Sequence, residues 1–111
     1  MNAPKRGDLI KCDFDNTIGH EQSDYRRALV ISDERYNART DLAIVCAITN
    51  QIKGWNIEVH IPNGLSVTGV ILPDQVRTID WRCRNAVVQD HVPDPVMEEV
   101  LAKLLLIIYP Q

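Results

Sequence analysis

The run LAIVCAI, residues 42–48, limits the folds open to this chain more than any other segment. It is apolar at every position and rich in β-branched side chains, which is typical of a central strand covered on both faces. Two further segments, DLIKCDFD (residues 8–15) and NIEVHI (residues 56–61), alternate apolar and polar residues and predict half-buried strands. In NIEVHI, Glu58 and His60 are expected to point away from the core. A sheet is therefore the main element expected.

Shorter strands are predicted at residues 28–31, 67–72, 75–79 and 86–89, with a turn of helix over residues 33–40. Near the end of the chain apolar residues recur at i, i+4 spacing, which predicts a helix over about residues 94–109. Asp94 is its expected N-cap, and its apolar stripe is expected to pack on the core rather than bind a partner. Strands joined by short turns and closed by one helix indicate the α+β class, mainly β, with a partly rolled antiparallel sheet.

The composition fits one globular domain over residues 1–111, with 45% hydrophobic and 24% charged residues. No apolar run approaches the roughly 20 residues of a membrane span, and the N-terminus lacks the apolar stretch of a secretory signal. We therefore expect a cytoplasmic protein that does not associate with membranes.

The net charge of −3 argues against a general nucleic-acid binder, because such domains are usually basic. Half of the Lys and Arg residues nevertheless fall in or beside three polar segments. They are Arg26, Arg27, Lys53, Arg77, Arg82 and Arg84. A local basic groove on an acidic body is compatible with this distribution.

The cysteines Cys12, Cys46 and Cys83 are odd in number and have no C-x-x-C spacing. The first two lie inside apolar patterns, where a thiol behaves as a small hydrophobe. The three histidines also lack the spacing of metal ligands. Reduced structural thiols are therefore expected, without a disulfide or a metal site.

The segment GHEQSDYRRALVIS, residues 19–32, places ionisable groups directly before an apolar strand. Arg26 sits one or two residues before that strand, so a rigid element would hold its backbone. A guanidinium presents five donors in a fixed fork and stays charged, which suits a phosphate. The alternative is an ion pair between Arg26 and Glu21 or Asp24.

Two further polar segments are open to two interpretations each. In AITNQIKG, residues 47–54, a strand runs into Thr49, Asn50, Gln51 and Lys53, which either form an ordinary polar turn or surround a nucleotide with hydrogen-bonding groups. DQVRTIDWRCR, residues 74–84, mixes basic residues with Trp81, which either stacks on single-stranded nucleic acid or lies in the core.

Taken together, these segments resemble the MazF/PemK toxins of bacterial toxin–antitoxin pairs. The G-x-E-Q…R, I-T-x-Q and D-Q-V-R-T-x-D-W-R motifs occur in the family's order and spacing, and the resemblance runs from about Gly7 to the terminal helix. It implies an SH3-like rolled sheet, usually as a homodimer, and a ribonuclease that cuts single-stranded RNA at short sequences. The family uses no metal or other cofactor and leaves a 2′,3′-cyclic phosphate and a 5′-hydroxyl.

The resemblance also implies roles for residues. The family's key arginine and threonine fall on Arg26 and Thr49. The remaining matches are an RNA-contacting loop and other positions near the groove: His20, Glu21, Gln22, Asn50, Gln51, Lys53 and Gln75, with Arg84 in the neighbouring basic cluster.

In the expected mechanism Arg26 and Thr49 stabilise charge on the phosphate while the RNA's 2′-hydroxyl attacks. Glu21 is the better candidate for the base and His20 the second, because an arginine is a poor base. The family accounts also give the arginine acid or base roles, so the proton transfers stay open.

The implied partners are single-stranded RNA and a cognate antitoxin, whose acidic C-terminal tail lies over the groove against Arg26, Lys53 and the Arg77–Arg84 cluster. Arg27, Ala47 and Asn16 replace prolines common in relatives, and Lys11 replaces a frequent aromatic residue. Two alternatives remain: a non-catalytic toxin of this fold that binds a protein such as gyrase, and a degenerate homologue that binds RNA or antitoxin without cleaving.

Overall fold

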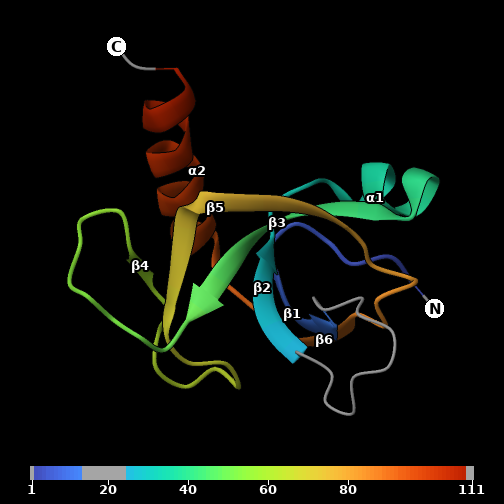
Figure 1. Cartoon of the computed structure of the whole chain (residues 1–111), viewed down its shortest axis with the longest axis horizontal. Coiled ribbons are helices and arrows are strands. Elements are labelled where there is room, and N and C mark those ends of the chain that lie inside the picture. Colours follow the sequence, from blue (N-terminus) through green and yellow to red (C-terminus); the bar gives the residue numbers. More distant parts are fainter. Residues whose placement is uncertain (1, 14–24, 110–111) are drawn as a thin grey trace, which may run out of the picture.

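The computed structural model describes residues 2–13 and 25–109, which form a curled six-stranded sheet with two helices (Figure 1). The elements are β1 (Asp8–Asp13), β2 (Tyr25–Val30), α1 (Glu34–Thr40), β3 (Leu42–Thr49), β4 (Val59–His60), β5 (Val70–Asp80), β6 (Val87–His91) and α2 (Asp94–Ile108). The sheet order is β4-β5-β3-β2-β1-β6, and every neighbouring pair is antiparallel. The predicted class, a mainly β fold with a rolled antiparallel sheet, a short helix and a C-terminal helix, is confirmed.

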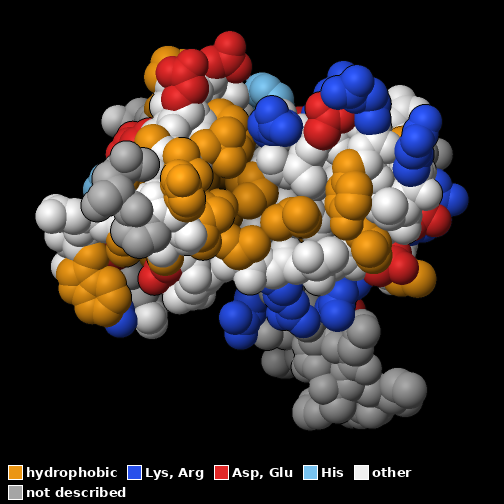
Figure 2. All heavy atoms as spheres, turned by 90° about the horizontal axis from the view of Figure 1, so that it is seen from above, with side chains coloured by type: hydrophobic (Ala, Val, Ile, Leu, Met, Phe, Trp, Pro, Cys, Tyr) orange, Lys and Arg blue, Asp and Glu red, His pale blue; other side chains and the backbone are white. Residues whose placement is uncertain are grey.

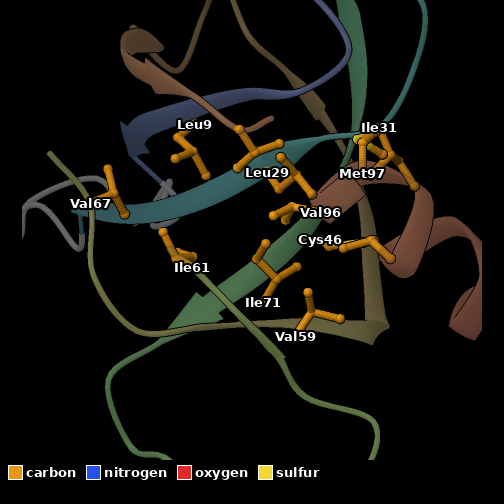
Figure 3. Close-up of a cluster of buried hydrophobic side chains, with 12 residues drawn as sticks. Leu9, Leu29, Ile31, Cys46, Val59, Ile61, Val67, Ile71, Val96 and Met97 are labelled. Carbon is orange, nitrogen blue, oxygen red and sulfur yellow. The ribbon is translucent and has the colours of Figure 1, made fainter. Parts of the chain in front are cut away.

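β3 lies inside the sheet, and its alternating side chains enter two hydrophobic clusters on opposite faces. Cys46 belongs to the larger cluster, which α2 closes with residues such as Val96 and Met97 (Figure 3). Val45 belongs to the second cluster, together with Trp81. The prediction that residues 42–48 form a central strand covered on both faces is therefore confirmed.

β5 is one strand instead of the two short strands expected on either side of Pro73. Its pairing with β3 shifts register just after the point where Cys46 faces Val76. The next residue, Ala47, faces Leu72, so three residues of β5 bulge out of the ladder. Proline has no N–H to donate and is tolerated at such a bulge. Figure 1 shows β5 turning sharply along its length.

The NIEVHI segment contributes only the two-residue strand β4. Val59 and Ile61 join the larger cluster as predicted. The prediction that Glu58 points to solvent is wrong, because this side chain is only 5% exposed. Its carboxylate accepts hydrogen bonds from backbone N–H groups of the preceding loop. Strand alternation carries no information on a loop that folds back over the strand.

Both predicted helices form. The Asp33 side chain caps α1 by accepting from the Arg35 backbone N–H at 2.8 Å. The predicted N-cap of α2 is wrong by one residue, because Pro93 occupies the cap without a side-chain hydrogen bond. Asp94 instead lies in the first turn, where the helix dipole favours a negative charge.

The apolar stripe of α2 is only partly buried. Val96, Met97 and Val100 pack into the larger cluster, and this half of the stripe confirms the prediction. At the C-terminal end, Leu105 and Ile108 of this stripe are 52% and 67% exposed, and there the prediction of core packing is wrong. Their neighbours Leu106, Ile107 and Tyr109, which lie outside the stripe, are 48–67% exposed as well. Figure 2 views the molecule from above Figure 1, where the C-terminal end of α2 lies, and shows hydrophobic side chains gathered on this face. Within the described residues, no helix is both long and apolar enough to cross a membrane.

The expectation of structural thiols is confirmed for Cys12 and Cys46, which are buried, and is wrong for Cys83, which is exposed. All three are free, with Cys12 and Cys46 buried and Cys83 exposed. Burial raises the pKa of the Cys12 and Cys46 thiols to about 12. A hydrogen bond to Asp80 raises the pKa of Cys83 above its ordinary value.

These environments predict selective thiol labelling. With a disulfide reagent at neutral pH, the native protein is expected to react at Cys83, whereas Cys12 and Cys46 react only after unfolding in guanidinium, because a buried thiol is neither accessible nor ionised. Spectrophotometric thiol counting checks this, and Cys83→Ser should abolish the native reaction. Fast native labelling of a second cysteine would contradict the burial of Cys12 and Cys46.

Candidate active site

A cavity of about 420 Å³ opens where β2 begins, β3 ends and β5 bulges. The loop of residues 50–58, between β3 and β4, completes its wall. Six of the side chains that the sequence predicts for the site line this cavity. They are Arg26, Thr49, Asn50, Gln51, Lys53 and Gln75.

Arg26 and Thr49 reach the cavity from adjacent strands. β2 pairs with β3 so that Ala28 faces Ala47. Two residues back along one antiparallel strand correspond to two residues forward along the other, so the continued register sets Arg26 opposite Thr49. Directly opposed residues project from the same face of a sheet, and both side chains line the cavity. A guanidinium and a hydroxyl that are distant in sequence thus converge.

The Thr49 hydroxyl accepts a hydrogen bond from the Gln51 backbone N–H at 3.0 Å. That bond occupies a lone pair and leaves the O–H proton able to donate to a ligand. Gly69 packs against the same residue: a Cβ built there would lie 2.4 Å from the Thr49 carbonyl oxygen. Gly69 has φ +114°, a conformation that side-chain-bearing residues rarely adopt, so this close approach depends on glycine.

Asn50 links three segments around the cavity. In the amide orientation that pairs every donor with an acceptor, its Oδ1 accepts from Arg27 Nη2 at 2.9 Å. Its Nδ2 donates to the Thr68 hydroxyl at 3.2 Å and to the Thr68 carbonyl at 3.1 Å. The end of β3 is thereby tied to β2 and to the segment that precedes β5.

The loop of residues 50–58 carries a cation and an aromatic ring to the cavity. Lys53 Nζ lies 4.6 Å from the centroid of the Trp55 ring, within the range of a cation–π contact. Trp55 is 59% exposed and lines the cavity. Backbone N–H donation, first from Lys53 and also from Gly54, holds the pKa of Glu58 below its ordinary value, so this carboxyl is ionised at neutral pH.

The charge of the cavity is mainly positive, with Arg26, Arg27 and Lys53 against Glu58 and Asp74. A positive, partly enclosed surface favours a phosphate-bearing ligand. Over residues 2–13 and 25–109, no group of three His, Cys, Asp or Glu side chains is arranged to hold a metal ion. A metal-free reaction stays a prediction.

The other four predicted site residues comprise three that the structure does not describe and one that lies away from this cavity. His20, Glu21 and Gln22 fall outside the described residues, as does the proposed pairing of Arg26 with Glu21 or Asp24. Arg84 lies elsewhere: its Nη1 donates to the Asp13 carbonyl at 2.9 Å.

The basic segment after β5 also turns away from the cavity. Trp81 is buried in the second cluster and donates through Nε1 to the Asn37 carbonyl at 2.9 Å, which confirms the core interpretation of this residue. Arg82 pairs with Asp41 at 3.3 Å and lies over the Trp81 ring. Arg77 lines a smaller hollow next to Arg26.

The sequence patterns missed Trp55, Glu58, Asp74 and the pairing of Arg27 with Asn50 as features of this cavity. Asp74 reaches it only because β5 bulges. Trp55 and Glu58 reach it because the loop folds back. The one available signal was the proximity of Trp55 to Lys53 in sequence, which is weak without the geometry.

The sequence and the fold match a known family. The family model described as PemK-like, MazF-like toxin of type II toxin–antitoxin system matches residues 5–108. The chain belongs to this family. It is 39% identical over 106 residues to the endoribonuclease toxin MazF of Escherichia coli strain K12, covering 96% of this chain and 95% of that protein.

Solved structures agree with the family assignment. MazF from Deinococcus radiodurans matches with a TM-score of 0.87 and 39% identity, covering 97% of this chain and 98% of that one. A chain in a MazE–MazF crystal structure from the same organism matches with a TM-score of 0.91 and 39% identity, covering 97% of each chain. The expected family resemblance is confirmed, and the chain is a MazF-type endoribonuclease toxin.

The contact between Gly69 and Thr49 predicts a specific defect. Gly69→Ala is expected to displace Thr49 and to lower endoribonuclease activity more than tenfold, because a shift of about 1 Å at a reacting group can cost about 10² in rate. The backbone strain adds a destabilisation of about 1–3 kcal/mol. Cleavage rates and urea unfolding measure the two effects separately.

Gly64→Ala provides the matched control. Gly64 also has a positive φ, of +96°, but a Cβ there would meet nothing within 4 Å. This variant should show backbone strain with activity retained. Equal activity of folded Gly69→Ala and Gly64→Ala would exclude a role for Gly69 in placing Thr49.

Proposed function

We propose that this MazF-type toxin cleaves single-stranded RNA at a short recognition sequence, without a metal ion, in the cavity between the start of β2 and the end of β3. The observation that carries this proposal is the meeting of Arg26 and Thr49 on one face of the sheet. A guanidinium and a hydroxyl on one face of a cavity can together bind a scissile phosphate diester. A non-catalytic toxin would not require this pair.

The cleavage proceeds by attack of the RNA's own 2′-hydroxyl on the adjacent phosphorus. The 5′-oxygen of the next nucleotide leaves and takes up one proton, which balances the one that the 2′-hydroxyl loses, giving a 2′,3′-cyclic phosphate and a 5′-hydroxyl. Arg26 neutralises the charge that develops on the non-bridging oxygens, and the Thr49 O–H donates to the same group. DNA lacks the nucleophile and is inert.

The base that removes the 2′-hydroxyl proton comes from the segment before β2. Glu21 is the first candidate and His20 the second, since a carboxylate or an imidazole can accept a proton near neutral pH. Arg26 is a poor base because a guanidinium stays protonated.

Sequence recognition falls to amide side chains around the cavity. Gln51 and Gln75 line it and present donors and acceptors that can read the edges of unstacked bases. Asn50 is held by Arg27 and Thr68, so it is oriented before RNA arrives. Gln22 completes the set, and Lys53 contacts the RNA backbone.

The proposed antitoxin is an acidic, partly disordered C-terminal segment that covers the same cavity. Such a segment would place carboxylates against Arg26, Arg27 and Lys53, where the phosphates of RNA would otherwise bind. Arg84 has a smaller part in this contact, because its guanidinium already binds the Asp13 carbonyl.

The toxin is also proposed to act as a homodimer, with the 111 residues of each subunit forming one unit in the cytoplasm. The exposed apolar end of α2, from Leu105 to Tyr109, supports this proposal. Contiguous apolar surface of this kind on a small protein marks an interaction site.

Substitution of the two central residues tests the reaction. Arg26→Ala and Thr49→Ala are each expected to slow cleavage by about 10²–10³-fold, because each removes a donor to the developing charge. Primer extension on a long RNA first locates the cut site, and rates then follow on a short RNA that contains it. A 2′-deoxy nucleotide at the cut should block cleavage altogether.

Arg35→Ala is the control, because Arg35 is exposed on α1 and pairs with Asp33 outside the cavity. It should cleave at the wild-type rate, and Thr49→Ser should restore most of the activity lost in Thr49→Ala. If either alanine variant keeps its circular dichroism spectrum and cleaves as fast as the wild type, the assignment of that residue is wrong.

The dimer is tested by light scattering after size exclusion. The wild type should have about twice the chain mass of 12.6 kDa. Leu106→Glu is expected to shift the population towards the monomer, because a buried carboxylate at an interface is unfavourable. Glu98→Gln, at an exposed position of the same helix, should leave the mass unchanged. A monomeric wild type at micromolar concentration would refute the dimer.

A further inference from the structure

The loop of residues 50–58 is tied down by Glu58. Its side chain is 5% exposed, and its two oxygens accept from consecutive backbone N–H groups, Oε2 from Lys53 at 3.0 Å and Oε1 from Gly54 at 2.9 Å. Its own N–H donates to the Trp55 carbonyl at 3.1 Å. Consecutive amides that converge on one anion form a rigid arrangement. Glu58 thus closes the loop on itself through both side chain and backbone.

Lys103, on α2, ties the same loop to the rest of the fold. Its Nζ donates to the Asn56 carbonyl at 2.5 Å and to the Glu58 carbonyl at 3.0 Å. It also pairs with Glu99 at 3.0 Å. An ammonium has three donors, and here all three find an acceptor. The loop is therefore fixed to a helix that is itself anchored in the core.

A carboxylate in the cavity wall without a partner in the protein would weaken RNA binding, because it repels phosphates. Glu58 lines the cavity beside Lys53 and Trp55. Its engagement by two N–H groups offsets that repulsion and places the cation and the ring at the cavity wall. The loop does not carry Arg26 or Thr49, which belong to β2 and β3.

We propose that Glu58 and Lys103 are positioning residues for the RNA strand: they hold the loop so that Lys53 contacts the RNA backbone and Trp55 offers its ring to a flanking base. This inference rests on the proposed function and extends it. Stacking of a base on an aromatic side chain is a general mode of single-strand binding. Because the catalytic pair lies on β2 and β3, and Glu58 and Lys103 contact the loop only within residues 53–58, loosening that part of the loop should weaken RNA binding and spare the chemical step.

Glu58→Gln tests the carboxylate. Glutamine has the same shape but turns an NH₂ group towards one of the two N–H donors. The KM for a short cognate RNA is expected to rise about tenfold, with kcat close to the wild-type value. The Lys53 and Gly54 amide protons should exchange faster with solvent in the RNA-free protein, as measured by NMR.

Lys103 provides the second variant, should Glu58→Gln fail to fold. Lys103→Met keeps the aliphatic stem but loses every donor, so KM should rise, whereas Lys103→Arg should restore part of the affinity. Glu98→Gln, on an exposed position of α2, controls for a changed charge on the helix and should behave as the wild type.

The outcomes separate this inference from the proposed function. If the wild type cleaves RNA and folded Glu58→Gln or Lys103→Met has an unchanged KM, or loses kcat alone, the positioning role is refuted and the function stands. If the wild type neither binds nor cleaves RNA, the proposed function fails and this inference fails with it.

Discussion

The pairing of β2 with β3 is the constraint on which the cavity depends. Side chains alternate with a period of two along a strand, so a slip of one residue would turn Arg26 to the other face of the sheet. The hydrophobic core holds this register. Ala28 and Val30 pack in the second hydrophobic cluster, and Arg26 projects from the same face of β2. On the facing strand β3, Val45 packs in the same cluster and Thr49 projects from the same face. Packing of this cluster thus fixes the strand register that sets Arg26 and Thr49 opposite each other.

The bulge in β5 adds the next level of organisation. It lies opposite the step from Cys46 to Ala47, where β3 leaves the core and enters the cavity. The extra residues of the bulge include Asp74 and Gln75, which line the cavity wall. In a regular ladder these two residues would pair with β3 instead. A bulge also bends its strand and increases the local twist, and the curl of the sheet and the opening of the cavity therefore have a common origin.

The strands and helices could be predicted because their periodicity reports burial directly. Pattern alone could not settle three features. Pro73 is compatible with either a strand end or a bulge. The stripe of α2 identifies an apolar face but not what covers its end. Glu58 follows the strand period while a loop from the same chain buries it. The pairing of Arg26 with Thr49 came from the family resemblance, because spacing alone favoured an ion pair for Arg26 and an ordinary polar turn for Thr49.

The acidic composition and the basic cavity are compatible because charge acts locally. At physiological salt the screening length is about 8 Å, so carboxylates on distant surfaces hardly weaken the attraction of the cavity for a phosphate. Several carboxylates are also paired away from it, such as Asp33 with Arg35 and Asp41 with Arg82. Within the wall, the Glu58 carboxylate is bound by backbone N–H groups. The net charge of the chain therefore bears on its solubility, whereas the three cations around Thr49 determine which ligand the cavity attracts.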